Sequence, residues 1–345
     1  ALLHSSTMVK AGVYIIARFA PVFEGELIGI LIALIGGITF LAASAIAISQ
    51  SNAKKVLAYS TIANLGLIVA CCGVGTAEAL WAAILLIIFH AIAKSLLFLS
   101  VGTVEHQIHS RDIEDMTGLV TKMPRITMMI LIGIAGMFLA PFGMLISKWA
   151  SLHAFVESVP PFGILLVIII AYGSGITAFF WAKWMGKLIA VGEPQQKDES
   201  HIPKSEKSIL YILSALTIGV CFGFPIISWS LIEPWLKTMY HSVTELISLS
   251  NIEIMFMMLF LVLIMPFSLA RFSRSASRVP RYLCGIPESR STEFIGSCGI
   301  KREIELSNYY LDKIFGEERL SRISVGIGIF LIVLILNIII VGGGL

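Results

Sequence analysis

Long apolar stretches recur along the whole of this 345-residue chain. A helix that crosses a lipid bilayer needs about 20 consecutive apolar residues. In lipid, every backbone amide must find its hydrogen-bond partner within the segment, so such stretches form helices. The sequence therefore predicts an all-α fold, a polytopic transmembrane helix bundle of about nine helices. The predicted helices cover residues 3–19, 26–49, 54–74, 77–103, 126–158, 161–190, 208–231, 253–271 and 322–341.

The lysines and arginines of the connecting loops test this layout. Even-numbered loops carry nearly all of these charges, whereas the odd-numbered loops carry only Arg18 and Lys237. Because cytoplasmic loops are enriched in lysine and arginine, the even loops are expected in the cytoplasm and the C-terminus outside. The protein is thus expected to be a multi-pass protein of the cell (inner/cytoplasmic) membrane. The net charge of +3 is then explained by the lysines and arginines of the cytoplasmic loops, which set the orientation of the chain in the membrane. No loop carries a nucleic-acid recognition motif, so no nucleic-acid partner is expected.

The chain opens at Ala1 and is apolar within two residues, without the charged region or cleavage site of a signal peptide. This start is typical of the middle of a larger membrane protein. The five cysteines show no metal-ligand spacing with a partner histidine, so no metal site is predicted. The loop at 104–125 concentrates His106 and His109 among charged residues. Zinc binding is an alternative there, but a salt-bridged loop is the preferred interpretation.

Three lysines lie inside the predicted spans, at positions 10, 94 and 148, while the other basic residues lie in loops or at helix ends. A cationic side chain at membrane depth costs at least about 2.5–3.5 kcal/mol and is a functional hypothesis by default. A structural anchor without an ion path is disfavoured by these residues. The sequence therefore predicts that Lys10, Lys94 and Lys148 belong to a path for charge.

The fourth predicted helix contains FHAIAKSLLFLSVGTV, in which His90 and Lys94 lie four residues apart and share one helix face. Histidine exchanges protons near neutral pH, and burial disfavours the charged form of lysine. The pair is therefore predicted to relay protons. In the alternative, Lys94 reaches a lipid headgroup and His90 packs in the core. The relay is preferred because Lys94 lies near the middle of the span.

The fifth stretch contains GMFLAPFGMLISKWASL and is too long for a plain span. Pro141 removes a backbone donor and Gly143 weakens the helix, so a break is predicted at membrane depth. Broken helices at that depth line protein-buried or wet cavities and mark ion sites in transporters. Lys148 follows the break. The alternative is a harmless proline kink, with the lysine reaching the interface.

The first stretch reads LLHSSTMVKAGVYIIARF and places His4 six residues before Lys10, so the two side chains do not share a face. His4 is a candidate relay residue. Lys10 is either part of the path or the partner of a carboxylate on another helix or on a neighbouring protein. The small residues between them are equally consistent with close helix packing.

These strings, together with KKVLAYSTIANLGLIVACCGVG and APFGMLISKW, resemble the antiporter-like subunits of the complex I superfamily. That superfamily includes the proton-pumping subunits of NADH-quinone oxidoreductase, multi-subunit cation/proton antiporters and the membrane arms of energy-converting [NiFe] hydrogenases. The resemblance extends from residue 1 to about residue 230. It implies a fold with two inverted five-helix repeats, each of which contains one broken helix.

The resemblance also implies a division of the chain. A truncated first repeat ends in 1–25, a second five-helix repeat broken at Pro141 carries the ion pathway, and further segments follow. A surface amphipathic helix is expected over 301–322, with an ordinary linker helix as the alternative. The expected units after 1–25 are 26–190 with the pathway, 191–271 with additional transmembrane helices, 272–321 as a cytoplasmic loop and 322–345 as the C-terminal transmembrane helix.

By motif, Lys94 resembles the central lysine of the family, His90 the histidine one turn before it, Lys148 the lysine that controls the outer exit, and His4 the bridging histidine. Two positions depart from the complex I pattern. Leu86 stands where many members have a histidine, and Trp149 follows Lys148 where they have an acidic residue.

The string PFGMLISKW resembles the hydrogenase branch more than complex I. The resemblance therefore implies a proton- or Na⁺-translocating subunit of a redox-driven oxidoreductase complex. No cofactor is expected in this chain, whereas Fe–S clusters and a Ni–Fe centre (or FMN) are expected in partner subunits. The expected partners are other membrane subunits and a cytoplasmic redox arm. The alternative is a subunit of a redox-independent Na⁺/H⁺ or K⁺/H⁺ antiporter.

Overall fold

A computed structural model gives the fold of the chain. His4, Pro141 and the predicted span at 253–271, apart from four single positions, lie outside the residues it describes. The described residues are 7–138, 143–158, 162–190, 199, 201–240, 253, 256–257, 260, 293–295, 301–303 and 310–342.

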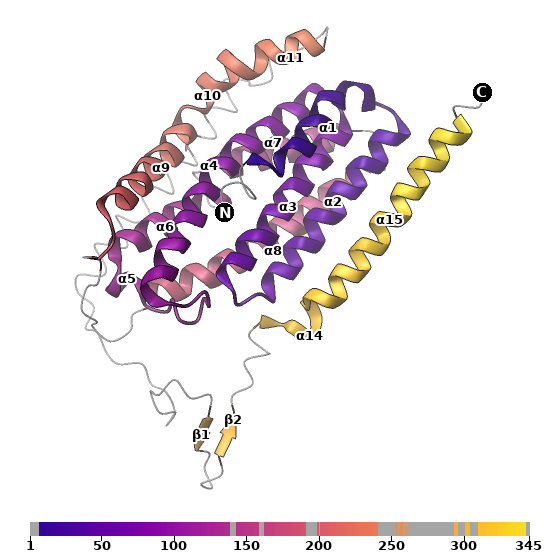
Figure 1. Cartoon of the computed structure of the whole chain (residues 1–345). Coiled ribbons are helices and arrows are strands. Elements are labelled where there is room, and N and C mark those ends of the chain that lie inside the picture. The colour runs from indigo at the N-terminus through magenta and orange to yellow at the C-terminus, as the bar shows by residue number, and fades with distance from the viewer. Residues whose placement is uncertain are drawn as a thin grey trace.

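The described residues form a bundle of helices (Figure 1), with α15 along α2 on one side and α9 against α4 and α6 on the other. One short antiparallel strand pair, β1 with β2, lies apart from the bundle. The elements are α1 (Lys10–Phe23), α2 (Leu27–Ile48), α3 (Ala53–Val74), α4 (Ala77–Ile108), α5 (Leu119–Lys122), α6 (Pro124–Phe138), α7 (Gly143–Glu157), α8 (Phe162–Ile189), α9 (Lys204–Phe222), α10 (Phe224–Ile227), a π-helical turn (Ser228–Ile232), α11 (Glu233–Met239), β1 (Glu293–Ile295), β2 (Lys301–Glu303), α14 (Asp312–Phe315) and α15 (Glu317–Gly342).

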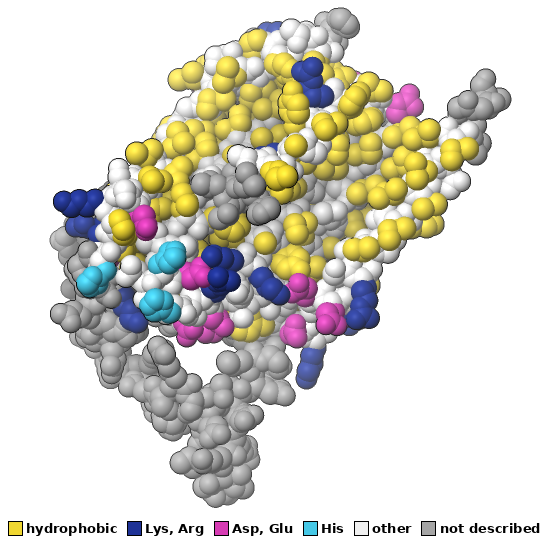
Figure 2. Space-filling view, viewed as in Figure 1, with side chains coloured by type: hydrophobic (Ala, Val, Ile, Leu, Met, Phe, Trp, Pro, Cys, Tyr) yellow, Lys and Arg dark blue, Asp and Glu magenta, His cyan; other side chains and the backbone are white. Residues whose placement is uncertain are grey.

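Seven helical segments of the described chain are long and apolar enough to cross a membrane. Each matches one of the nine predicted spans, so the predicted fold class, a polytopic helical bundle, is confirmed. The first predicted span corresponds to α1, whose 14 described residues begin at Lys10. In Figure 2, apolar side chains cover the helices, and charged side chains gather near α5 and α14. A surface of this kind is suited to contact with lipid.

The end of the bundle that carries Lys54, Arg111 and Lys187 is called the basic end here. At this end α2 connects to α3 through Asn52, whose side chain accepts hydrogen bonds from the backbone amides of Lys54 and Lys55. This N-cap satisfies two amides that have no partner inside the helix. At the opposite end, α3 stops at Gly75, which adopts a left-handed conformation with φ of 76° that glycine accepts without strain.

Close contact between α2 and α3 rests on small residues. A side chain at Gly36 would run into backbone atoms of Gly66 and Ala70, and one at Gly73 would meet the backbone of Ala33. Without side chains at these positions the two helices approach closely, and dispersion contacts between them accumulate. This packing places the backbone of Phe40 of α2 against Gly66 of α3.

Two segments differ from the sequence predictions. The expected helix over 301–322 begins instead with strand β2, and α15 already starts at Glu317. The span expected at 208–231 is divided into α9, α10 and the π-helical turn, because Pro225 and Pro234 each remove a backbone donor. The turn is held to α4 by a hydrogen bond of 2.7 Å from Trp81 Nε1 to Ser228 Oγ.

Candidate functional site

Lys94 lies in the interior of the bundle and is fully buried. Its Nζ donates to the backbone oxygen of Leu57 at 2.9 Å and to Ser60 Oγ, both on α3. The ring centroid of Trp181 on α8 lies 5.2 Å from the same Nζ. A lysine ammonium over an indole face is attracted by the ring quadrupole. Lys94 is therefore held by neutral groups of two neighbouring helices.

His90 lies one turn before Lys94 on α4 and is also fully buried. Among the described residues, neither ring nitrogen of His90 has a hydrogen-bond partner. The ring is within electrostatic range of both Lys10 and Lys94. Buried polar groups in folded proteins are almost always hydrogen-bonded to protein or ordered water. His90 is therefore a buried imidazole near two amines, with both ring nitrogens left without a protein partner in the described chain.

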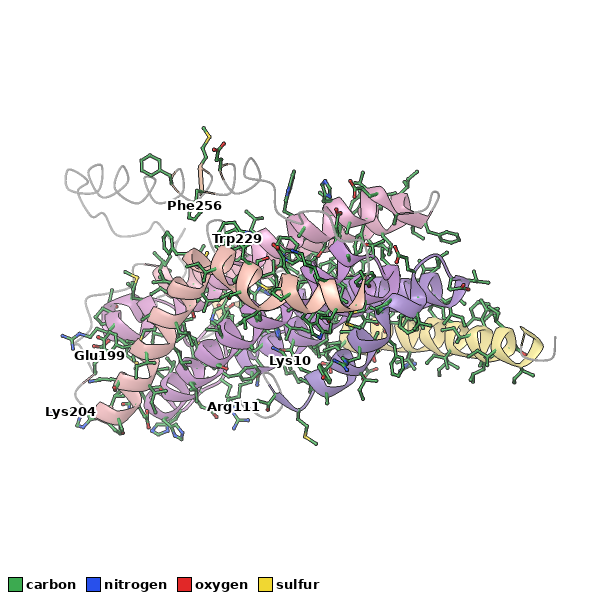
Figure 3. All side chains as sticks on the ribbon, turned by 90° about the horizontal axis from the view of Figure 1, so that it is seen from above. Lys10, Arg111, Glu199, Lys204, Trp229 and Phe256 are labelled. Carbon is green, nitrogen blue, oxygen red and sulfur yellow. The ribbon has the colours of Figure 1, made fainter. Side chains whose placement is uncertain are left out.

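Lys10 of α1 lies among the helices of the bundle, in contrast to Lys204 at its edge (Figure 3). Its Nζ donates to the backbone oxygen of Ile87 at 2.9 Å. Ile87 precedes His90 by one turn of α4. Among the described residues, the partner of Lys10 is therefore a backbone carbonyl. The sequence analysis had considered a carboxylate on another helix as an alternative partner.

The break predicted at Pro141 falls in the segment between α6 and α7 and outside the described residues. The described part of α6 ends at Phe138, and α7 begins at Gly143. A side chain at Gly143 would collide with the ring of Phe89 on α4, so glycine allows α7 to start directly against α4.

Lys148 lies in α7, further from the break, and is 9% exposed. Its Nζ donates to Thr177 Oγ1 of α8 at 3.1 Å and lies 5.9 Å from the ring centroid of Phe40. Lys148 also lines an open cavity of about 220 Å³ together with Trp149 and Ser174. The lining of this cavity is mostly apolar, and Lys148 and Thr177 are among its few polar residues.

Helix α8 connects the two central lysines. Thr177 and Trp181 lie four residues apart and so share one face of α8. The first contacts Lys148 and the second contacts Lys94. The structure thus brings Lys10, His90 and Lys94 together and links Lys148 to them through α8.

The acceptors for these amines were missed by the sequence analysis. Ser60 and Thr177 are neutral hydroxyl residues of apolar helices, and nothing in the sequence separates them from packing residues. The four-residue spacing of Thr177 and Trp181 indicates only that these two side chains share one face of a helix.

The site has no acidic counter-charge in the described chain. None of the ion pairs formed there involves Lys10, Lys94 or Lys148. A proton can therefore arrive at or leave an amine without separating an ion pair.

The loop at 104–125 is ion-paired, as the preferred interpretation predicted. Glu105 pairs with both Lys54 and Arg111, and Glu114 pairs with Lys187 at 2.5 Å. These pairs connect the end of α4 to the start of α3, and the loop after α4 to the end of α8.

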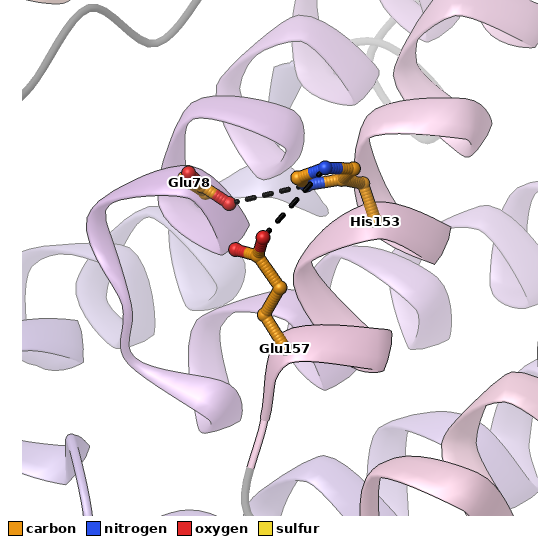
Figure 4. Close-up of side chains that lie close together, drawn as sticks. All are labelled: Glu78, His153 and Glu157. Atoms are coloured by element: carbon orange, nitrogen blue, oxygen red, sulfur yellow. Dashed lines mark hydrogen bonds and ion pairs between the residues drawn. The ribbon is translucent and has the colours of Figure 1, made fainter.

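A second cluster of polar side chains lies opposite the basic end, where α4 begins and α7 ends. Figure 4 shows its members, Glu78, His153 and Glu157. His153 Nδ1 lies 3.4 Å from a carboxylate oxygen of Glu78, and its Nε2 lies 3.7 Å from one of Glu157. The cluster joins the first turn of α4 to the last turn of α7. His153 and Glu157 are more than half exposed, so solvent screens the pairs.

Replacing His153 with alanine is therefore expected to lower the free energy of unfolding by no more than about 1 kcal/mol. The midpoint of thermal unfolding in detergent measures this change. A larger loss would show that the cluster is a major constraint on α7.

Comparison with known proteins places the chain in a family. The family described as "NADH:quinone oxidoreductase/Mrp antiporter, TM" matches residues 1–176. This match covers half of the chain, and the chain belongs to that family. It is accordingly an antiporter-like, multi-pass membrane subunit of the Mrp and complex I superfamily, as the resemblance predicted.

Two curated relatives are Na⁺/H⁺ antiporter subunits. The chain is 33% identical over 268 residues to a Na⁺/H⁺ antiporter subunit of Bacillus subtilis, covering 71% of this chain and 34% of the relative. It is 36% identical over 274 residues to a Na⁺/H⁺ antiporter subunit of Staphylococcus aureus strain RF122, again covering 71% of this chain and 34% of the relative. The chain thus spans about a third of the length of these relatives.

Two solved structures share the fold. The membrane-bound sulfane sulfur reductase, an archaeal respiratory membrane complex, aligns with a TM-score of 0.61 and 24% identity over 69% of this chain and 48% of the other. The Mrp complex from Dietzia sp. DQ12-45-1b aligns with a TM-score of 0.57 and 23% identity over 82% of this chain and 32% of the other.

One prediction is wrong. The sequence analysis assigned the chain to an oxidoreductase complex, but the two curated relatives are Na⁺/H⁺ antiporter subunits. The similarity of PFGMLISKW to the hydrogenase branch did not identify a redox partner.

Proposed function

We propose that the chain is the ion-translocating part of a Na⁺/H⁺ antiporter subunit that works without electron transfer. The observation that carries this proposal is the set of buried amines, Lys10, Lys94 and Lys148, each held by neutral oxygen atoms. Buried basic residues that face a bundle interior mark ion pathways. The Na⁺/H⁺ antiporter relatives support Na⁺ as the exchanged cation.

In this proposal, protons pass between the amines and His90 through ordered water. Lys94 takes a proton while Leu57 and Ser60 hold its ammonium group, and His90 transfers protons between Lys94 and Lys10. Lys148 exchanges protons with water in the cavity beside it. The positive-inside rule places the basic end in the cytoplasm.

The partners in this proposal are other membrane subunits of the same complex. Both solved structures that share the fold belong to multi-component membrane assemblies by their descriptions. The proposal requires no iron–sulfur, nickel–iron or flavin group in a partner.

The test is ion exchange by the complete complex in proteoliposomes. With an imposed pH gradient and no electron donor, addition of Na⁺ is expected to collapse the gradient, whereas choline is expected to leave it intact. Collapse that occurs only when an electron donor and acceptor are supplied would refute the proposal.

A further inference from the structure

A fourth amine, that of Lys183, is partly buried near the basic end. Lys183 was assigned by the sequence analysis to the loop charges, but the structure places it within α8, where it is partly buried. Its Nζ donates to the backbone oxygen of Ile48, the last residue of α2, at 2.7 Å. The last carbonyls of a helix have no partner inside the helix, so this contact satisfies one of them.

A polar cluster surrounds Lys183 on the side of the basic end. The ring centroid of Tyr310 lies 4.2 Å from Lys183 Nζ, and the Tyr310 hydroxyl donates to Glu114 Oε1 at 2.6 Å. Lys187, one turn further along α8, donates to Glu114 Oε2 at 2.5 Å. Glu114 is within electrostatic range of Lys183 without pairing with it directly. This arrangement places a carboxylate and a phenol at the surface side of the amine.

Lys94 lies deeper in the bundle than Lys183. The carbonyl that binds Lys183 ends α2 at the basic end, and α3 starts beside it at Ala53. Lys94 instead binds Leu57 and Ser60, further along α3. At 1.5 Å per residue, these acceptors lie about 6 to 10 Å deeper than the start of α3.

Trp184 supplies an unused donor beside these residues. It follows Lys183 directly, is fully buried, and stacks on Trp181 with ring centroids 5.8 Å apart and an interplanar angle of 12°. Trp181 is the ring that contacts Lys94. Within the described chain, Trp184 Nε1 has no hydrogen-bond partner. Leaving a buried donor unpaired costs about 1–3 kcal/mol, and ordered water commonly satisfies such groups.

We infer that Lys183 is the proton-access residue of the basic end, from which water bound at Trp184 Nε1 leads to Lys94. This inference rests on the proposed antiport function and adds a residue to its path. The competing explanation is that Lys183 only caps the C-terminus of α2 and has no part in transport.

The conservative variant Lys183→Arg separates these two roles. Arginine keeps the positive charge and can donate to the Ile48 carbonyl, but it cannot be deprotonated in a protein. If Lys183 carries protons, exchange by the complete complex in proteoliposomes falls at least about tenfold, since proton-transfer groups contribute about 10²–10⁴-fold in rate. The exposed residue Lys204 at the same end provides the control, because Lys204→Arg is expected to leave exchange unchanged. Wild-type exchange by Lys183→Arg would overturn the inference.

A second variant tests the water position. Trp184→Phe keeps an aromatic ring to stack on Trp181 but removes the unpaired donor. We expect it to slow exchange severalfold while the assembled complex keeps its thermal unfolding midpoint. Unchanged exchange would overturn the route past Trp184. If a neutral replacement of Lys94 abolishes exchange while both variants here keep wild-type rates, this inference fails and the proposed function stands.

Discussion

Replacing Lys94 with methionine is expected to reduce Na⁺/H⁺ exchange by the complete complex by about 10²-fold or more. Methionine has a similar length and volume, so it can pack against Trp181 and Leu57 without leaving a large cavity. It cannot hold a proton, whereas the Ser60 hydroxyl keeps its own hydrogen bond to the Leu57 backbone oxygen at 3.0 Å. Exchange is measured as the initial rate of Na⁺-driven collapse of an imposed pH gradient in proteoliposomes.

Loss of exchange has meaning only if the complex still assembles. The protein composition and thermal unfolding of the purified complex establish this for the Lys94→Met variant. Lys204→Met, which removes a lysine from the exposed start of α9, is expected to behave as wild type. A Lys94→Met complex that keeps the wild-type rate would exclude Lys94 from the path and, with it, the proposed function.

The fold class and the lysines of the site could be predicted from the sequence because the membrane restricts both. An apolar stretch of spanning length has to form a helix, and a charge inside it has to face the protein interior. These two constraints suffice to place His90 and Lys94 on one inward face of α4. The interruption before Lys148 was predicted separately, from Pro141 and Gly143, and Pro141 lies outside the described residues.

The groups that hold the amines could not be predicted. Lys10 binds the backbone oxygen of Ile87, and every residue of an apolar helix offers such an oxygen. The choice depends on how α1 and α4 pack, which is a tertiary property. Ser60 and Thr177 are likewise ordinary residues until a lysine from another helix reaches them.

Lys183 was missed for a different reason. Counting loop charges assigns any lysine near the end of a span to the loop, although a long side chain there can turn inward. The signal was present in the string WAKWMGK, where Lys183 lies inside the predicted span at 161–190 and between two tryptophans.

The branch of the superfamily could not be predicted from PFGMLISKW. That string contains a proline, a glycine and a lysine, whose physical effects are a weakened helix and a buried charge. None of these effects depends on whether a partner subunit carries out redox chemistry.

Replacing Gly66 with alanine is expected to lower the stability of the complex by about 1–3 kcal/mol, a typical cost of overpacking. A Cβ atom at Gly66 of α3 would lie 2.7 Å from both the Gly36 oxygen and the Phe40 nitrogen of α2. Both are backbone atoms, so no side chain can turn away and the helices have to separate. The midpoint of thermal unfolding of the purified complex measures the loss.

Gly175→Ala is the matched control, because a Cβ at Gly175 of α8 meets no atom within 4 Å. Alanine in a helix interior is favoured over glycine by about 0.5–1 kcal/mol, so this variant is expected to match or exceed wild-type stability. Equal midpoints for the two variants would contradict the close packing of α2 against α3. Separation of these helices also moves Phe40 away from Lys148, and Leu57 away from Lys94. The Gly66→Ala complex that remains folded is therefore expected to exchange ions more slowly than wild type, which links the packing of α2 and α3 to the geometry of the ion path.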